Sequence, residues 1–157
     1  MKRPRLKMRL GDLLVHEQII SEKELETALE KQREPGRKLG ATLIDLGYIT
    51  EQQLLEFLAQ QLKLPLLSIT ERRIPPEAFK LLPEVQARRH RALVIEADDS
   101  EALVGMSDPA DLSSIDAINQ LLAPRQVELA VVPEGELLTA FDNLYRRTKE
   151  IETFASQ

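Results

Sequence analysis

The sequence predicts an α+β protein, in which an N-terminal tandem repeat of four helices is followed by a small α/β unit with a three-stranded, partly antiparallel sheet. Two observations support this prediction. The first third of the chain repeats at a spacing of 29 residues, with helical periodicity in both copies. The rest alternates short apolar runs, which are typical of strands, with helical stretches. A chain of 157 residues has the length of one domain or of two small ones.

The repeat aligns residues 9–32 with residues 38–61 without a gap. Eight of the 24 aligned pairs are identical, whereas average composition would give roughly one or two by chance. We therefore interpret the two segments as copies of one unit. The identical pairs are Leu10/Leu39, Gly11/Gly40, Leu14/Leu43, Ile20/Ile49, Glu22/Glu51, Leu25/Leu54, Leu29/Leu58 and Gln32/Gln61.

Each copy is predicted to form a short helix followed by a longer one. Residues 21–24 and 50–53 have the capping-box pattern at the start of the longer helices. Gly47 is placed to end the short helix of the second copy, because glycine accepts the left-handed conformation. In each longer helix two leucines four residues apart share one face. A Pro-Gly turn within residues 33–37 joins the two copies.

The repeat has ended by Leu64, and beyond it prolines separate short helical stretches. Two apolar runs joined by a turn at residues 98–100 predict an antiparallel hairpin. The expected strands cover residues 92–95, 102–106 and 127–132, and the expected helices cover residues 77–82, 84–89, 111–122 and a last stretch from Pro133 through Tyr145.

These patterns divide the chain into three segments. Residues 1–64 are the helical tandem-motif subdomain, and residues 65–147 are the small α+β subdomain. Residues 148–157 are polar, so we expect a frayed end there, the remnant of a linker.

Composition excludes several classes of protein. The chain has no cysteine, which rules out disulfides, thiol nucleophiles and cysteine-bound zinc, and it has only two histidines, so no metal site is expected. No apolar run approaches the roughly 20 residues of a membrane-spanning helix. Polar residues also interrupt the N-terminal segment where a secretory signal would be apolar. We therefore expect a cytoplasmic protein without direct membrane insertion.

The charge is distributed unevenly along the chain. Residues 1–9 contain five basic residues and no acid, whereas the remainder carries 16 basic against 26 acidic residues, a net charge of −10. An acidic body argues against broad binding to nucleic acid, which depends on many basic residues. DNA is therefore not expected as a partner. The basic arm is interpreted as a solubilising terminus, with a local anion site as the alternative.

Catalytic signatures are missing from this sequence. It contains no GxxxxGK[ST] phosphate loop, no GxSxG elbow and no HExxH pair. The carboxylates are scattered, and His16 and His90 are interpreted as surface residues. We therefore predict no catalytic residues and expect this chain not to be an enzyme by itself.

The first, third and last positions of each copy hold a basic residue, a glycine and a glutamine. Glycine permits close approach of the backbone, and free N–H groups at a helix start favour anions. A guanidinium can pair with phosphate or guanine, and a glutamine amide both donates and accepts. Two such units, with leucines as an apolar surface for purine rings, suit a ligand with two equivalent halves. The alternative interpretation makes the leucines core, the glycines packing points and the glutamines surface residues.

This pattern resembles the MshEN domain, the N-terminal regulatory module of bacterial type IV pilus and type II secretion assembly ATPases, and is most similar to its mannose-sensitive haemagglutinin pilus branch. The family binds cyclic di-GMP through two tandem motifs of 24 residues separated by five residues, which is the spacing found here. The ligand-binding residues that the resemblance implies are Arg9, Leu10, Gly11, Leu14, Leu25, Leu29 and Gln32 in the first motif, and Lys38, Leu39, Gly40, Leu43, Leu54, Leu58 and Gln61 in the second.

Two further residues bear on this expected site. Lys38 stands where the family has arginine, and an ammonium can meet a phosphate but cannot form the planar fork of a guanidinium. We therefore expect binding with unequal halves. The resemblance extends through residues 106–109 and implies that Asp108 lies near the ligand, where its carboxylate could accept from the guanine N1–H and N2–H groups. The alternative is that Asp108 caps the helix expected at residues 111–122.

The resemblance implies a cyclic di-GMP receptor module that regulates an ATPase motor domain further along the parent chain. The alternative is a docking module that binds an inner-membrane platform protein of a pilus or secretion system without nucleotide. Loss of the motif glutamines would favour docking alone, and both glutamines are present here. The expected location is the cytoplasm, at the inner face of the inner membrane through partners.

Overall fold

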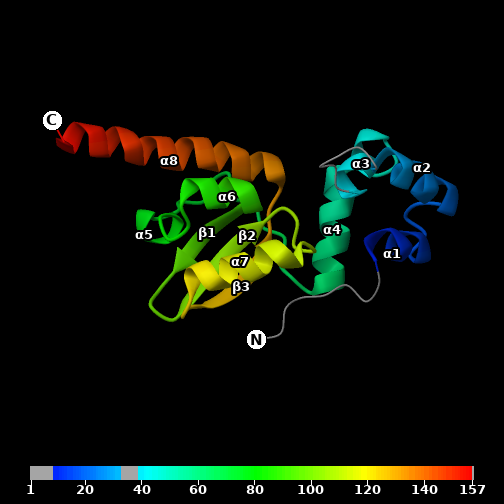
Figure 1. Cartoon of the computed structure of the whole chain (residues 1–157), viewed down its shortest axis with the longest axis horizontal. Helices are drawn as coiled ribbons and strands as arrows, with labels where there is room; N and C mark the ends of the chain where they lie inside the picture. Colours follow the sequence, from blue (N-terminus) through cyan, green and yellow to red (C-terminus); the bar gives the residue numbers. More distant parts are fainter. Residues whose placement is uncertain (1–8, 33–38, 157) are drawn as a thin grey trace.

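The computed structural model describes residues 9–32 and 39–156, with side chains described through residue 146 (Figure 1). Within these residues the chain forms eight helices and one three-stranded sheet, so the predicted α+β class is confirmed. The elements in chain order are α1 (Leu10–His16), α2 (Glu22–Gln32), α3 (Leu39–Asp45), α4 (Glu51–Leu62), α5 (Pro76–Phe79), α6 (Glu84–His90), β1 (Ala92–Ala97), β2 (Glu101–Met106), α7 (Leu112–Leu122), β3 (Gln126–Val131) and α8 (Glu134–Ser156).

The first four helices gather at one end of the molecule, and the sheet with the other helices lies at the opposite end (Figure 1). Both α1 and α3 are seven residues long, and their first residues are 29 positions apart. The longer helices α2 and α4 also begin 29 positions apart. Each copy of the motif therefore forms a short helix and then a longer one, as predicted. A common origin by duplication stays a prediction.

The predicted capping boxes are both confirmed. In the first box, the Ser21 amide donates to Glu24 Oε1 (2.8 Å) and the Glu24 amide donates to Ser21 Oγ (3.1 Å). In the second box, the Thr50 amide donates to Gln53 Oε1 (2.9 Å) and the Gln53 amide donates to Thr50 Oγ1 (3.1 Å). These reciprocal bonds satisfy amides that have no partner within the first helical turn. They explain why α2 and α4 begin at equivalent residues.

The turns after α1 and α3 both contain a residue in the left-handed conformation. Gly47 follows α3 with a φ of +80°, as its glycine predicted. Gln18 occupies the equivalent position after α1 with a φ of +62°. That conformation costs a residue with a Cβ roughly 1–2 kcal/mol. The same backbone turn is therefore made by glycine in one copy and, at higher cost, by glutamine in the other.

The sheet has the order β1-β2-β3 and is mixed. Strands β1 and β2 pair antiparallel, with a bulge between Val94 and Glu96, whereas β2 and β3 pair parallel. A parallel pair needs a crossover connection, and α7 supplies it. The short turn at residues 98–101 joins the antiparallel pair. Amides of Ser100 and Glu101 donate to Asp98 Oδ1, both at 2.8 Å, and these bonds with the Ser100 hydroxyl hold the pKa of Asp98 below its usual range.

Helix α4 joins the two halves of the molecule because it is buried on two adjoining faces. Leu54 and Leu58 lie in the apolar cluster of α1–α4. Leu55 and Ala59, one position further along, pack with Val131 at the end of β3. Residues four apart share one helix face, so each pair belongs to a different core. The segment after α4 then runs beside β3, where the Val131 amide donates to the carbonyl oxygen of residue 65 at 2.8 Å.

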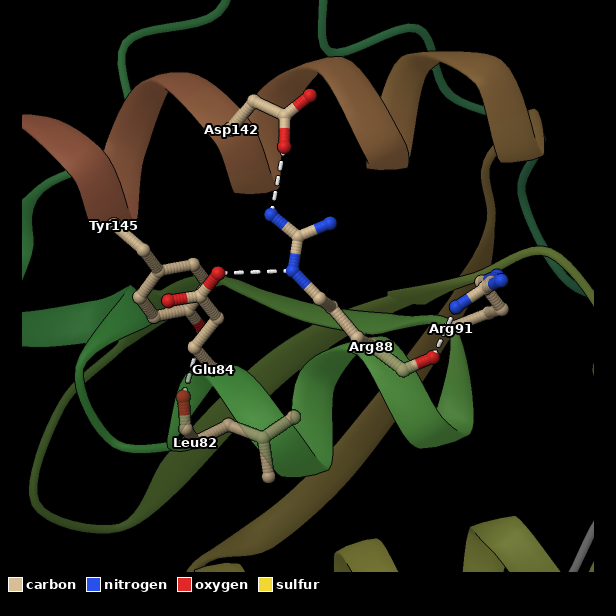
Figure 2. A network of polar contacts seen from close by, with 6 residues as sticks. All are labelled: Leu82, Glu84, Arg88, Arg91, Asp142 and Tyr145. Atoms are coloured by element: carbon tan, nitrogen blue, oxygen red, sulfur yellow. Dashed lines mark hydrogen bonds and ion pairs between the residues drawn. The ribbon is translucent and has the colours of Figure 1, made fainter.

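Helix α8 is fastened to α6 by ion pairs (Figure 2). Arg88 on α6 donates from Nε to Glu84 Oε2 (2.9 Å) and from Nη2 to Asp142 Oδ1 on α8 (2.7 Å). Arg91 donates from Nε to Glu134 Oε1 at the start of α8 (2.9 Å). The buried Tyr145 hydroxyl bonds the Leu82 carbonyl at 2.7 Å, and burial raises its pKa to about 12. Contacts on three turns of α8 therefore fix its direction.

Two sequence predictions in this half need correction. The helix expected at residues 77–82 is shorter, because α5 ends at Phe79 and the chain turns before Pro83, which disfavours helical geometry in the residue before it. The frayed backbone expected from residue 148 is wrong, since α8 continues to Ser156. No glycine or proline follows Gly135 to end that helix. The role of residues 148–157 as a linker stays a prediction.

Candidate functional site

The predicted site residues lie on α1–α4 and on the loop before α7. One apolar cluster contains or borders most of the motif leucines, so the structure brings the two copies together. Lys38 lies outside the described residues. The buried motif leucines are Leu14, Leu43, Leu54 and Leu58, and the partly buried leucines packed against them are Leu10, Leu25 and Leu39.

Equivalent leucines of the two motifs differ in exposure. Leu58 is only 2% exposed, whereas Leu29 is 45% exposed. The reason lies in the position of the two helices: α4 stands between the motif cluster and the sheet, whereas α2 lies on the outside (Figure 1). The interpretation of the leucines as core therefore holds for the second motif. It does not explain Leu29, which presents a large apolar side chain to the surface.

Both motif glycines make room for a leucine. A Cβ built on Gly11 would lie 2.5 Å from Leu25 Cδ1 and 3.1 Å from Leu39 Cδ2. A Cβ built on Gly40 would lie 2.8 Å from Leu54 Cδ2. These distances are shorter than carbon atoms tolerate without displacement. The glycines therefore have a packing role, and Gly11 also faces the second copy. Contact between their backbone and a phosphate stays a prediction.

The polar motif residues lie at helix ends and are accessible. Arg9 is exposed and directly precedes α1, and its carbonyl accepts from the Leu13 amide at 2.9 Å. Gln32 is the last residue of α2, and Gln61 is the last but one of α4; both are half-buried. Side chains in such positions can reach a molecule bound beside the helix ends while their stems pack on the protein.

Asp108 lies on the loop of residues 107–111, which contacts the motif helices. Ala110 of this loop packs against the apolar cluster of α1–α4. The cap of α7 is Asp111, whose Oδ1 accepts from the Ser114 amide at 3.2 Å. The alternative that Asp108 caps this helix is therefore wrong. Asp108 itself is half-buried, and its carbonyl accepts from the Asp111 amide at 3.2 Å.

A polar cluster beside this loop was missed by the sequence analysis. His90, predicted to be a surface residue, is half-buried, and its Nδ1 lies 2.8 Å from Ser114 Oγ. Ser114 Oγ donates to Asp111 Oδ2 at 3.0 Å. Serine, histidine and aspartate are the residues of a hydrolytic triad, but here the hydroxyl lies between the carboxylate and the imidazole. A triad needs the imidazole in the middle, so this cluster activates no nucleophile.

A hollow of about 530 Å³ lies between residues 69–74 and the first turns of α8, and of the motif copies only Glu51 at the start of α4 lines it. Glu136 lines it, and its Oε1 accepts from Ser68 Oγ (2.8 Å), the Ile69 amide (2.8 Å) and Thr70 Oγ1 (3.0 Å). Burial alone raises the pKa of Glu136, but these hydrogen bonds outweigh it, so its pKa lies below the usual value. The carboxylate thus ties the segment after α4 to α8.

Metal and membrane features are absent from the described part of the chain. No group of three or more acidic or histidine side chains there could hold a metal ion. None of the helices in those residues combines the length and hydropathy that crossing a bilayer requires.

The elements define an α+β module in which paired helical units are joined through one long helix to a mixed sheet. The family model of the MshEN domain matches residues 62–151, more than half of the chain. The chain belongs to the MshEN domain family. This match begins at the end of α4, so it covers the sheet and its helices and leaves out both copies of the motif.

Comparison with individual proteins extends the likeness to the motif helices. The solved structure of MshE with cdg has 48% sequence identity and a TM-score of 0.77, and covers 87% of this chain and 98% of that one. The type IV pilus assembly ATPase PilB of Myxococcus xanthus (strain DK1622) is 30% identical over 137 residues, or 87% of this chain. The N-terminal domain of XpsE shares the fold, with a TM-score of 0.67, 21% identity, and coverage of 90% of this chain and 97% of that one.

The chain spans only a part of the curated relatives that it matches. It covers 24% of the Myxococcus PilB and between 13% and 18% of the others. The similarity to assembly ATPases is therefore a similarity to a fraction of their length.

Proposed function

We propose that this chain is a cyclic di-GMP receptor module. The observation that carries the proposal is a pair of motifs, complete except for Lys38, in a chain 48% identical over most of its length to MshE, whose structure holds cdg. In this proposal one cyclic di-GMP molecule spans the two motifs, with one half of the dinucleotide on each copy.

The surroundings of the motif residues support contacts of each residue with a different part of the ligand. Exposed Arg9 would meet a phosphate or a guanine through its planar fork of donors. Gln32 and Gln61 would donate to and accept from a base edge or a ribose. Leu29, exposed on its helix, would cover a purine ring. Because the equivalent Leu58 is buried, we propose that the two halves of the ligand are held unequally.

The parent protein is proposed to be an assembly ATPase of a type IV pilus or type II secretion system. The similarity to part of PilB supports this proposal, and the chain itself has no phosphate-loop sequence. The partner of the module would be the motor domain further along the parent chain, with α8 leading towards it. The module would then act in the cytoplasm, at the inner face of the inner membrane.

A docking function without nucleotide is the alternative proposal. The fold shared with XpsE, at 21% identity, does not extend to particular residues and does not favour docking over binding of a nucleotide. Both motif glutamines are retained in this chain, and a surface used only for docking has no need of them.

Calorimetric titration of the chain with cyclic di-GMP tests the proposal, with the linear dinucleotide and ATP as comparison ligands. We expect one cyclic di-GMP bound per chain, much weaker binding of the linear form, and no ATP turnover. Equal affinity for the linear dinucleotide, saturation at two ligands per chain, or ATP hydrolysis by the chain would contradict it. Absence of binding would favour the docking function.

A further inference from the structure

We propose that His90, Ser114 and Asp111 act together as a positioning relay that holds the loop carrying Asp108 against the motif helices. The inference rests on the proposed function, since its purpose is to place Asp108 beside the ligand. None of the three residues is itself proposed to touch cyclic di-GMP.

The direction of the hydrogen bonds follows from the number of protons available. Ser114 has one hydroxyl proton and donates it to Asp111 Oδ2 at 3.0 Å. Its lone pairs then face His90 Nδ1 at 2.8 Å, so this nitrogen is the donor. The Ser114 amide donates to Asp111 Oδ1 at 3.2 Å. Both carboxylate oxygens of Asp111 are thus bound by one residue, which in turn is bound by His90.

Burial makes this arrangement costly to disturb. Ser114 is only 6% exposed, and a buried hydroxyl requires hydrogen-bond partners. Its partner His90 is the last residue of α6, and that helix packs on β1 and on α8. The relay therefore transfers the fixed position of α6 to the first turn of α7.

The loop is attached at its beginning to the end of α6, and a hydrogen bond within the loop links its end to Asp108. At its beginning, the Ser107 amide donates to the carbonyl of Arg91, the residue next to His90, at 3.3 Å. At its end, the Asp111 amide donates to the Asp108 carbonyl at 3.2 Å. Between these points Ala110 packs on the motif cluster. Movement of Asp111 would therefore move the backbone of Asp108.

A simple helix cap would explain the bonds from Ser114 to Asp111, but it has no need of a histidine behind the serine. The two interpretations differ in what they predict for binding. A cap that only stabilises α7 lowers stability and leaves the affinity of the folded chain unchanged. A positioning relay changes affinity, and does so through Asp108.

A double-mutant cycle of Ser114→Ala and Asp108→Ala, measured by calorimetry with cyclic di-GMP, separates these interpretations. We expect Ser114→Ala to weaken binding about three- to tenfold. In the Asp108→Ala background the same change should have no further effect. The matched control is Ser68→Ala, which removes a hydroxyl that bonds Glu136 away from the loop, and it should leave affinity unchanged.

Substitution of His90 gives a second test that does not disturb the cap. His90→Asn keeps an N–H donor close to the position of Nδ1 and should preserve affinity, whereas His90→Leu removes the donor and should weaken binding. Hydrogen exchange of the amides of residues 107–111 in the free chain is expected to accelerate in His90→Leu and in Ser114→Ala. Circular dichroism establishes that each variant is folded.

The outcomes keep the two proposals apart. Suppose that the unsubstituted chain binds cyclic di-GMP. If Ser114→Ala then binds equally well, or lowers the affinity by the same factor with and without Asp108, the relay is wrong and the receptor function stands. Unchanged exchange of the loop amides in both variants also overturns the relay. If the unsubstituted chain binds no cyclic di-GMP, the proposed function fails, and with it the purpose of the relay.

Discussion

Replacing Leu29 and Leu58 by alanine, one at a time, tests whether equivalent motif positions have different physical roles. Leu58 is 2% exposed inside the cluster of α1–α4, so its removal leaves a cavity. Buried leucine-to-alanine changes cost about 2–5 kcal/mol. Leu29 is 45% exposed, and water fills the space that its side chain leaves. Since full burial of a leucine contributes about 1.5–3 kcal/mol, a half-covered one contributes about 1 kcal/mol.

We therefore expect Leu58→Ala to lower the free energy of unfolding by about 3 kcal/mol and Leu29→Ala by about 1 kcal/mol. For a chain of this length, a difference of about 2 kcal/mol corresponds to a melting temperature roughly 4–8 °C lower for Leu58→Ala. The order should reverse for binding, because Leu29 is available to a ligand. Leu29→Ala should weaken cyclic di-GMP binding although it remains nearly as stable as the parent.

Urea unfolding followed by circular dichroism measures the stabilities, and calorimetry on the folded variants measures the affinities. Val85→Ala serves as a control, because Val85 is an apolar residue 66% exposed on α6, away from the motifs. It should change stability by no more than about 0.5 kcal/mol. Equal losses of stability for Leu29→Ala and Leu58→Ala would refute the reasoning from burial. Unchanged affinity in Leu29→Ala would remove this leucine from the proposed site.

Three further predictions concern the polar residues and the glycines. Arg9→Ala should weaken cyclic di-GMP binding about ten- to a hundredfold and Gln32→Ala by about 1 kcal/mol, while Lys38→Arg should be neutral or improve it; calorimetry at two salt concentrations measures this, and an unaffected, folded Arg9→Ala would exclude the contact. Gly11→Ala should weaken binding strongly and lower the melting temperature only slightly, because the new Cβ would meet the end of the Leu25 side chain, which can move aside. If the variant instead unfolds when it loses binding, Gly11 has a packing role alone. Glu136→Gln should destabilise the chain at about pH 7, and this loss should shrink as the pH falls below the usual pKa of a glutamate. The folded pKa of Glu136 is lowered, so its contribution is present above the unfolded pKa and is lost as pH falls through the folded one; a difference in urea midpoint that persists in acid would contradict this.

Features that depend on neighbours along the chain could be predicted from the sequence. The capping boxes at Ser21 and Thr50, the left-handed Gly47 and the antiparallel hairpin all formed where expected. Each of these needs only residues a few positions apart, so the local residue pattern contains the necessary information. The equal spacing of the helices in the two motif copies follows from the same kind of signal.

Features that depend on contacts across the fold could not be predicted. Gln18 adopts the left-handed conformation, and no glycine at that position indicates the turn in the sequence. His90 and Ser114 are 24 positions apart and meet only because the fold brings the last residue of α6 beside the first turn of α7. Residues 148–157 were expected to be frayed because they are polar, but α8 continues through them to Ser156.

The repeated motif and the family that it resembles were therefore determined by the sequence alone, because residue identity at fixed spacing is enough to recognise them. The difference between the two copies was decided by the tertiary structure. The leucines shared by α2 and α4 have different environments, because only α4 packs against both the motif cluster and Val131 of the sheet, through Leu55 and Ala59 where α2 has Glu26 and Glu30. Burial depends on which surfaces meet in space, and the leucines themselves, which are identical in the two copies, do not show which of them is covered.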